Sequence, residues 1–174
     1  MLKLKGKHIY LRALEPSDLE FLYQLENNPE VWEISGTTTP YSRHTLQNYL
    51  DNAHRDIYEV KQLRLTISAI SSQTLGFIDL FDFDPRHRRA GLGIVVLEEK
   101  NRNKGIGTEA ISLMCDYAFT ILDMHQIYAH VLEDNAASIR MFQKLGFEYT
   151  GVRKDWVLSE GVFKNELLFQ KIKN

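Results

Sequence analysis

The segment KNRNKGIGTEA, Lys100 to Ala110, decides how the rest of the chain is organised. It follows the apolar run LGIVVL and precedes a long stretch with helical apolar spacing, so it predicts a turn from a strand into a helix. The first amides of a helix lack internal partners and lie at the positive end of its dipole, where they can bind an anion. Gly105 and Gly107 would let the backbone approach that anion, and the basic residues before them add charge. A pyrophosphate is therefore the ligand that we expect.

Two other glycine-rich motifs fit this segment less well. A Walker phosphate loop is longer and ends in Gly-Lys-Ser/Thr, whereas Lys104 precedes its glycine. The dinucleotide fingerprint allows Ala110 in place of its third glycine in some versions. It also requires repeated strand–helix–strand units and an acidic residue about 20 positions further on, and Asp134 lies beyond that distance. An ordinary turn without a ligand stays open at this point.

The composition is that of a globular protein. Of the 174 residues, 44% are hydrophobic and 25% are charged, and a net charge of −2 does not indicate a general nucleic-acid binder. Cys115 is the one cysteine, which excludes an internal disulfide and favours a reducing cytoplasmic location. We find neither a signal peptide nor a run of about 20 apolar residues that would span a membrane. We expect one domain over residues 1–174.

The apolar periodicity predicts an α+β fold with mixed α/β layers. Strands 63–69 and 75–83 should form an antiparallel hairpin, and Gly146 should end a helix in the left-handed conformation. The predicted strands are 8–14, 63–69, 75–83, 92–97, 127–132, 149–158 and 163–172. Four helices are predicted. The first has a capping box of Ser17 and Glu20 at its start, the second covers 42–53, the third covers about 105–122, and the fourth runs from the cap Asn135 to Leu145.

Two segments resemble the signatures of the GNAT superfamily of N-acetyltransferases. Arg102-Asn103-Lys104-Gly105-Ile106-Gly107 is similar to its R/Q-x-x-G-x-G/A motif. Asn135 to Phe147 resembles its N-x-x-[AS]-x-x-x-[YF]-x-x-x-G-F segment, about one strand later and in the family order. IYLRALEPSDLEFLYQLENNPEV and YAFTILDMHQIYAHVLEDN resemble the branch of ribosomal-protein N-terminal acetyltransferases and bacterial spermidine acetyltransferases. The similarity thus extends over nearly the whole chain.

The resemblance implies the GNAT acyl-CoA N-acyltransferase fold, with a mostly antiparallel sheet of about six to seven strands and about four flanking helices. Acetyl-CoA, the co-substrate, would lie in a V-shaped opening between strands 92–97 and 127–132. The histidines show no metal-binding spacing, so no metal is expected. The implied cofactor-binding residues are Val95, Val96, Leu97, Arg102, Asn103, Lys104, Gly105, Ile106, Gly107, Thr108, Asn135, Ser138 and Phe142.

The resemblance also implies direct attack of a deprotonated amine on the thioester carbonyl. Phe142 stands where many family members have a tyrosine that protonates the leaving thiolate, so Ser138, at the serine of N-x-x-S, is the implied general acid. An ordinary first-turn helix serine explains Ser138 equally well. The family's glutamate is absent from Ala90-Gly91-Leu92. Asp79 and Asp82 are candidate bases, although solvated or hydrogen-bonded strand residues are the commoner alternative.

The acceptor is less constrained. We expect a protein N-terminal amine or a small primary amine, with a polyamine as the alternative. Spermidine acetyltransferases of this branch carry an acidic cluster between their first two helices, whereas GTTTPYSRH, Gly36 to His44, is neutral to basic. The resemblance places part of the acceptor pocket at Trp156, Phe163 and Asn165, which packing explains equally well.

Two other classes of function stay open. A non-catalytic acetyl-CoA-binding sensor would account for Phe142 and the missing glutamate, and a nucleotide-binding regulator would bind ATP or NAD instead. The expected partners are acetyl-CoA and the amine, without nucleic acid or membrane, and homodimers are common among relatives of this kind.

Overall fold

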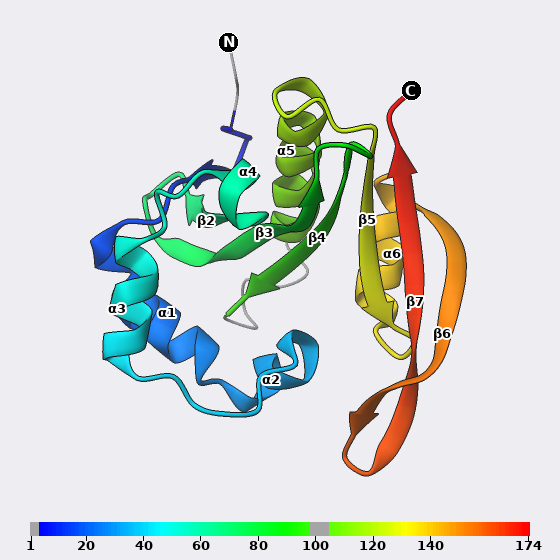
Figure 1. Cartoon of the computed structure of the whole chain (residues 1–174), viewed down its shortest axis with the longest axis horizontal. Coiled ribbons are helices and arrows are strands. Elements are labelled where there is room, and N and C mark those ends of the chain that lie inside the picture. The colour runs from blue at the N-terminus through cyan, green and yellow to red at the C-terminus, as the bar shows by residue number, and fades with distance from the viewer. Residues whose placement is uncertain (1–3, 98–104) are drawn as a thin grey trace.

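The computed structural model describes residues 4–97 and 105–174 (Figure 1). These residues form a seven-stranded sheet in the order β1-β2-β3-β4-β5-β7-β6. Neighbouring strands are antiparallel except β4 and β5, which are parallel, so the expected mostly antiparallel α+β sheet is confirmed. The strands are β1 (Ile9–Arg12), β2 (Leu63–Ala69), β3 (Thr74–Asp84), β4 (Arg89–Val96), β5 (Gln126–Leu132), β6 (Glu148–Ser159) and β7 (Val162–Ile172).

The described residues hold more helical segments than the four expected. The 3₁₀ turn η1 precedes α1, and α2 and α4 were not predicted. The segments are η1 (Pro16–Asp18), α1 (Leu19–Glu26), α2 (Pro29–Ser35), α3 (Arg43–Asp51), α4 (Ile57–Val60), α5 (Ile106–Thr120) and α6 (Ala136–Lys144). None of these helices in the described part of the chain is long and apolar enough to cross a membrane.

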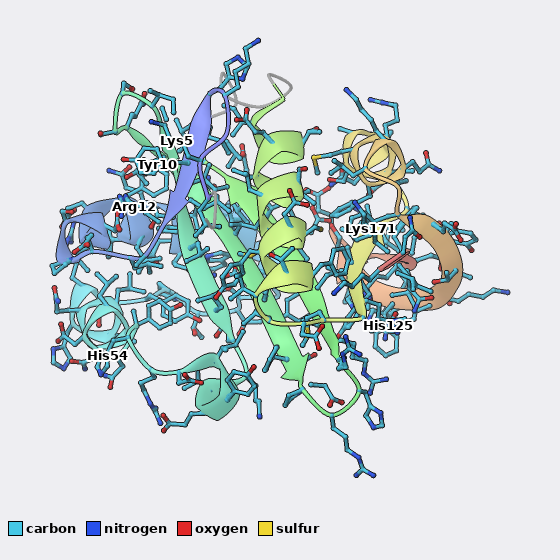
Figure 2. All side chains as sticks on the ribbon, turned by 90° about the horizontal axis from the view of Figure 1, so that it is seen from above. Lys5, Tyr10, Arg12, His54, His125 and Lys171 are labelled. Atoms are coloured by element: carbon cyan, nitrogen blue, oxygen red, sulfur yellow. The ribbon has the colours of Figure 1, made fainter. Side chains whose placement is uncertain are left out.

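The main core lies between the sheet and α5, which runs along the strands in Figure 2. Alternation along β5 buries Ile127, Ala129 and Val131 in this core and leaves Tyr128 and His130 half-buried on the opposite face of the sheet. The buried positions of α5 recur at helical spacing, as predicted, and are Ile106, Ala110, Ile111, Met114, Cys115 and Ala118.

A second core cluster packs the N-terminal helices against the other face of the sheet. It joins Leu22 and Leu25 of α1, Val31 of α2 and Leu46 of α3 to Phe77 of β3. In Figure 1 these helices lie on the side of β1 to β4 and leave α2 below the gap between β4 and β5. Helices therefore cover both faces of the sheet, and α2 lies near the place where β4 and β5 meet.

The start of the first helix differs from the prediction. The capping box of Ser17 and Glu20 is wrong, because the amide of Glu15 donates instead to the Asp18 carboxylate at 2.8 Å. Asp18 is buried, and both its oxygens accept from the Arg12 guanidinium at 2.8 Å. The observed capping box is therefore formed by Glu15 and Asp18, and the ion pair with Arg12 ties the helix start to β1.

The turns flanking α6 were predicted correctly. The Asn135 side chain accepts a hydrogen bond from the Ser138 amide at 3.1 Å, as an N-cap should. Gly146 follows the helix with a φ of +84°, in the left-handed region. The predicted hairpins β2–β3 and β6–β7 are also present.

Candidate active site

The sheet divides between β4 and β5. Beyond their shared segment, β4 stays paired with β3, and β5 stays paired with β7 as far as Leu132. Figure 1 shows the two strands diverging, as the expected V-shaped opening requires. Within the described residues, β4 and β5 pair at Arg89↔Gln126, Ala90↔Ile127 and Gly91↔Tyr128.

Phe81 covers the point where the strands part. It pairs with Gly91, and a Cβ atom built on Gly91 would lie 2.3 Å from Cε2 of its ring. The ring continues across to β5, where its centroid lies 6.1 Å from that of Tyr128 and 6.4 Å from that of His130. Phe81 therefore fills the space that a side chain at position 91 would need, and an acidic residue there would displace it.

A pocket of about 420 Å³ opens beside the diverging strands. Its walls come from α2, the second half of β4, the start of α5 and the start of α6. Arg102, Asn103 and Lys104 lie outside the described residues. The predicted cofactor-binding residues that line the pocket are Val95, Val96, Gly105, Gly107, Thr108, Asn135 and Ser138.

Three predicted residues lie behind the pocket wall. The Leu97 amide donates to the carbonyl of Leu75 at 3.1 Å, so it faces β3. The side chain of Ile106 is buried in the main core. Phe142 is also buried, stacked against Phe169 and edge-on to Phe147. For Phe142, the structure shows a core position.

The two motif glycines are required for different reasons. Gly105 caps α5 with a φ of +77° and has open space around a built Cβ, so backbone conformation selects glycine there. A Cβ on Gly107 would meet the Met141 sulfur at 3.0 Å, so the close approach of α6 selects glycine there. The start of a 15-residue helix thus lines the pocket with residues that leave its backbone accessible, which fits a pyrophosphate.

Ser138 presents its hydroxyl to the same pocket. Its amide is used by the Asn135 cap, whereas no hydrogen bond of the hydroxyl to another described residue is found. A serine oxygen carries one proton and two lone pairs, so this hydroxyl is able to donate to a group held in the pocket. Its role as general acid stays a prediction.

The two aspartates proposed as bases have different environments. Asp79 is clamped by Arg64, with Nε to Oδ1 at 2.7 Å and Nη2 to Oδ2 at 3.0 Å. Arg64 also donates to Glu26 at 2.8 Å, and all three side chains are largely buried. Asp79 therefore serves this network. Asp82 is exposed in a bulge of β3, with a φ of +48°.

Asn165 of the last hairpin also has a structural task. Its amide nitrogens donate to the Glu133 carboxylate at 2.9 and 3.0 Å, and its side-chain oxygen accepts from the amide of Asp155 at 2.9 Å. Trp156 is exposed, with the Arg153 guanidinium 5.0 Å from its ring centre. These hydrogen bonds account for Asn165, whereas Trp156 and Phe163 are both exposed and packing within the hairpin does not account for them.

Sequence reasoning missed the contribution of α2. Glu30, Val31 and Ile34 of this helix line the pocket, together with Ile94, Ala137 and Met141 from predicted elements. Among residues 4–97 and 105–174, no group of three or more His, Cys, Asp or Glu side chains is placed to hold a metal ion.

A second cavity of about 650 Å³ adjoins the first, and Glu30 lines both. The loop after α2 and the end of the β6–β7 hairpin complete its walls. Its charged lining residues in the described chain are all acidic, namely Glu30, Glu33 and Glu160. Trp32 and Leu158 add apolar surface.

An internal cation lies beside this cavity. Lys164 Nζ is 2.7 Å from Glu33 Oε1 and 2.8 Å from Asp134 Oδ2. Its hydrogen bonds to the Asp134 and Glu33 carboxylates raise the pKa of the Lys164 ammonium, and the bond that Glu33 accepts from Lys164 lowers the pKa of Glu33. The end of α2 thus already stabilises an ammonium group.

Comparison with known proteins identifies the family. The Acetyltransferase (GNAT) domain family matches residues 8–148. The chain is 30% identical over 146 residues to the spermidine N(1)-acetyltransferase of Vibrio cholerae, covering 84% of this chain and 82% of that protein. It is also 30% identical over 171 residues to the probable N-acetyltransferase YjcK of Bacillus subtilis, covering 93% and 92%.

A solved structure shows the same fold. The crystal structure of the Vibrio cholerae spermidine N-acetyltransferase in complex with CoA and spermine superposes with a TM-score of 0.84 at 24% identity, covering 94% of this chain and 95% of that one. The sheet opening, the pocket at the start of α5 and these matches agree. The chain therefore belongs to the GNAT acetyltransferase family and is an acetyl-CoA-dependent N-acetyltransferase.

Proposed function

We propose that the protein transfers the acetyl group to a primary amine of an aliphatic polyamine, with spermidine as the representative acceptor. The acid-lined cavity next to the cofactor pocket carries this proposal, because none of its described lining residues is basic. Aliphatic amines of this kind resemble lysine, whose pKa is about 10.4, so they are cationic at neutral pH. Carboxylates along the approach to the pocket would favour a substrate with several positive charges.

The geometry of the two cavities suits an extended acceptor. Glu30 lies where they meet, so one end of a polyamine can enter the cofactor pocket while its other nitrogens stay beside Glu33 and Glu160. Trp32 and Leu158 provide apolar surface for the methylene segments between the nitrogens. The pairing of Lys164 with Glu33 shows that this environment accommodates an ammonium group.

Similarity to known enzymes supports the same acceptor class. The Vibrio cholerae and Escherichia coli relatives are spermidine N(1)-acetyltransferases, at 30% and 29% identity. The neutral-to-basic loop Gly36–His44, which argues against a polyamine at the sequence level, is preceded by α2. Because α2 carries Glu30 and Glu33, the acidic groups come from the helix before that loop. A protein N-terminal amine has less support, because a single ammonium group does not need this many carboxylates.

Thiol release from acetyl-CoA tests the proposal. Purified protein is assayed with spermidine, with a monoamine of similar length, and with a short peptide that has a free N-terminal serine or alanine. We expect the largest kcat/KM with spermidine. Turnover of the peptide with no turnover of spermidine would refute the polyamine assignment and restore the N-terminal amine as the acceptor.

Two substitutions assign the effect to the acidic cavity. Glu30→Gln and Glu33→Gln should each raise the KM for spermidine about three- to fivefold, the usual size for a partly exposed ion pair, with a smaller effect on the monoamine. Glu148→Gln, an exposed residue of β6 that lines neither cavity, is the matched control and should change neither KM. Equal effects on both amines would show that these carboxylates do not select charge.

A further inference from the structure

His130 is a titratable side chain at the apex of the opening, and the site described above gives it no role. His130 lies on β5 two residues after Tyr128, the last β5 residue that pairs with β4. Continuing that parallel register would set His130 opposite Gly93 of β4, and no pairing is found there among the described residues. His130 thus borders the opening between its apex and Ile94, where the β4 wall of the pocket begins.

His130 also lies on the face from which an acceptor can approach. Its neighbours in β5, Ala129 and Val131, are buried against the α5 side, so His130 points to the other face with Tyr128 and Phe81. Ser138 belongs to α6, which packs with α5. The two groups therefore flank the opening from opposite faces of the sheet, as a proton acceptor for an incoming amine and a proton donor for a leaving thiolate would.

The charges around His130 favour a neutral ring. Its Nδ1 is buried, lies 3.4 Å from Glu166 Oε1 and makes no hydrogen bond with a described residue. Burial lowers the pKa of His130, opposed by the negative charges of Glu166 and Asp82 and assisted by the positive charge of Arg153. Tyr128 is the other titratable neighbour, in edge-to-face contact. The net shift of the pKa is downward, so the imidazole is uncharged at neutral pH.

The Glu166 carboxylate lies beside one nitrogen of the His130 ring. It accepts from Arg153 at 3.0 Å and faces Nδ1 of His130 from the neighbouring strand β7. Since Nδ1 is the buried nitrogen and 21% of the side chain is exposed, the exposed part of the ring belongs to its other atoms. A proton on Nδ1, facing the carboxylate, leaves the lone pair on Nε2.

We propose that His130 is the general base of the acetyl transfer, in place of the family's glutamate that is absent from Ala90-Gly91-Leu92. Nε2 accepts one proton from the substrate ammonium, which frees the lone pair of the amine to attack the carbonyl carbon of the thioester. When the carbon–sulfur bond breaks, the Ser138 hydroxyl gives its proton to the sulfur and takes up the second proton of the nitrogen, so that the amide and the thiol are released neutral. His130 then returns its proton to solvent. The inference rests on the acetyl transfer of the proposed function and not on which amine is the acceptor.

The dependence of kcat/KM on pH tests this role, measured with the amine that the enzyme turns over fastest. His130→Gln should lower kcat about a hundredfold or more, the usual contribution of a general base, and leave the KM for acetyl-CoA within about twofold. The wild-type enzyme should lose activity as the pH falls through the pKa of His130, and this acidic limb should be absent from His130→Gln. His125→Gln is the matched control, an exposed histidine just before β5 that is labelled in Figure 2, and should behave as wild type.

Two further variants separate a chemical from a structural role. Glu166→Gln removes a charge that raises the pKa of His130, so the acidic limb should move to lower pH. Imidazole in the buffer should restore part of the activity of His130→Ala. If His130→Gln keeps kcat within about threefold and the same acidic limb, His130 is not the base. If spermidine is inert but another amine shows the predicted profiles, the acceptor proposal fails and this one holds.

Discussion

Replacing Gly91 by alanine should lower the free energy of unfolding by about 1–2 kcal/mol, whereas the same change at Gly93 should not lower it. The two glycines lie on the same face of β4, and neither has a positive φ. A Cβ on Gly91 would lie 2.3 Å from Cε2, 2.4 Å from Cζ and 2.8 Å from Cδ2 of Phe81. On Gly93 the nearest atom, Cε1 of the same ring, is 3.8 Å away, which is an ordinary contact.

The magnitude follows from what Phe81 must give up. Carbon atoms pack at about 3.5–4.0 Å, so a ring whose nearest atom lies 2.3 Å from the new Cβ must move by roughly 1.5 Å to accept the methyl group. That movement disturbs its edge-to-face contact with Tyr128 and its contact with His130, and aromatic contacts of this type are each worth about 0.5–1.5 kcal/mol. At Gly93 the methyl group meets no obstacle, and the reduced freedom of the unfolded chain should stabilise the protein by up to about 1 kcal/mol.

Urea denaturation of the two variants measures the difference directly. The double variant Phe81→Leu/Gly91→Ala supplies the cycle, because a smaller side chain at position 81 should remove most of the penalty and give a coupling free energy of about 1 kcal/mol. Equal midpoints for Gly91→Ala and Gly93→Ala, or additive effects in the double variant, would refute the claim that Phe81 occupies the space beside Gly91.

Two other variants address the buried carboxylates. Asp79→Asn should destabilise the fold by about 1.5–3 kcal/mol, as expected for a lost charged hydrogen bond. Because Asp79 is held by Arg64, kcat of the folded enzyme should stay within about twofold. A large fall in kcat with unchanged stability would make Asp79 the base instead. Burial alone would raise the pKa of Asp18, but its bonds to Arg12 hold that pKa below the usual value. Its stabilising effect is therefore complete above the unfolded-state pKa of about 3.9 and is lost as the pH falls through the lower folded-state value, so urea midpoints should decline with pH below about 4 and Asp18→Asn should flatten that decline.

The parts of the fold that local patterns determine were predictable from the sequence. The alternation of β2 and β5, the helical spacing of α5 and the caps at Asn135 and Gly146 all depend on residues close together in the chain. Seven residues predicted to bind the cofactor line one pocket for the same reason, since the two motifs sit where elements begin.

Short helices and long-range partners were harder to predict. α2 has seven residues and buries one of them, Val31, so it lacks the repeated apolar spacing that predicts a helix. Its termini do carry signals: the Asn28 side chain accepts from the Glu30 amide at 3.0 Å, and Gly36 has a φ of +71°.

The role of each buried carboxylate depends on an arginine from another element of the fold. Asp79 meets Arg64 across two paired strands, and Asp18 meets Arg12 across a turn. Local sequence patterns do not single out His130, because its place beside Phe81 and Glu166 depends on the pairing of strands far apart in the chain.

The short β4–β5 ladder means that few backbone hydrogen bonds join the two halves of the sheet in the described part of the chain. Strands β1 to β4 and strands β5 to β7 form two parts of the sheet, and within the described residues three residue pairs join them. α5 packs against β1, β3 and β4 on one side of this junction and against β5 on the other, so the helix bridges the two parts. Amide hydrogen exchange at Arg89–Gly91 and Gln126–Tyr128 accordingly reports the opening of this junction, separately from global unfolding.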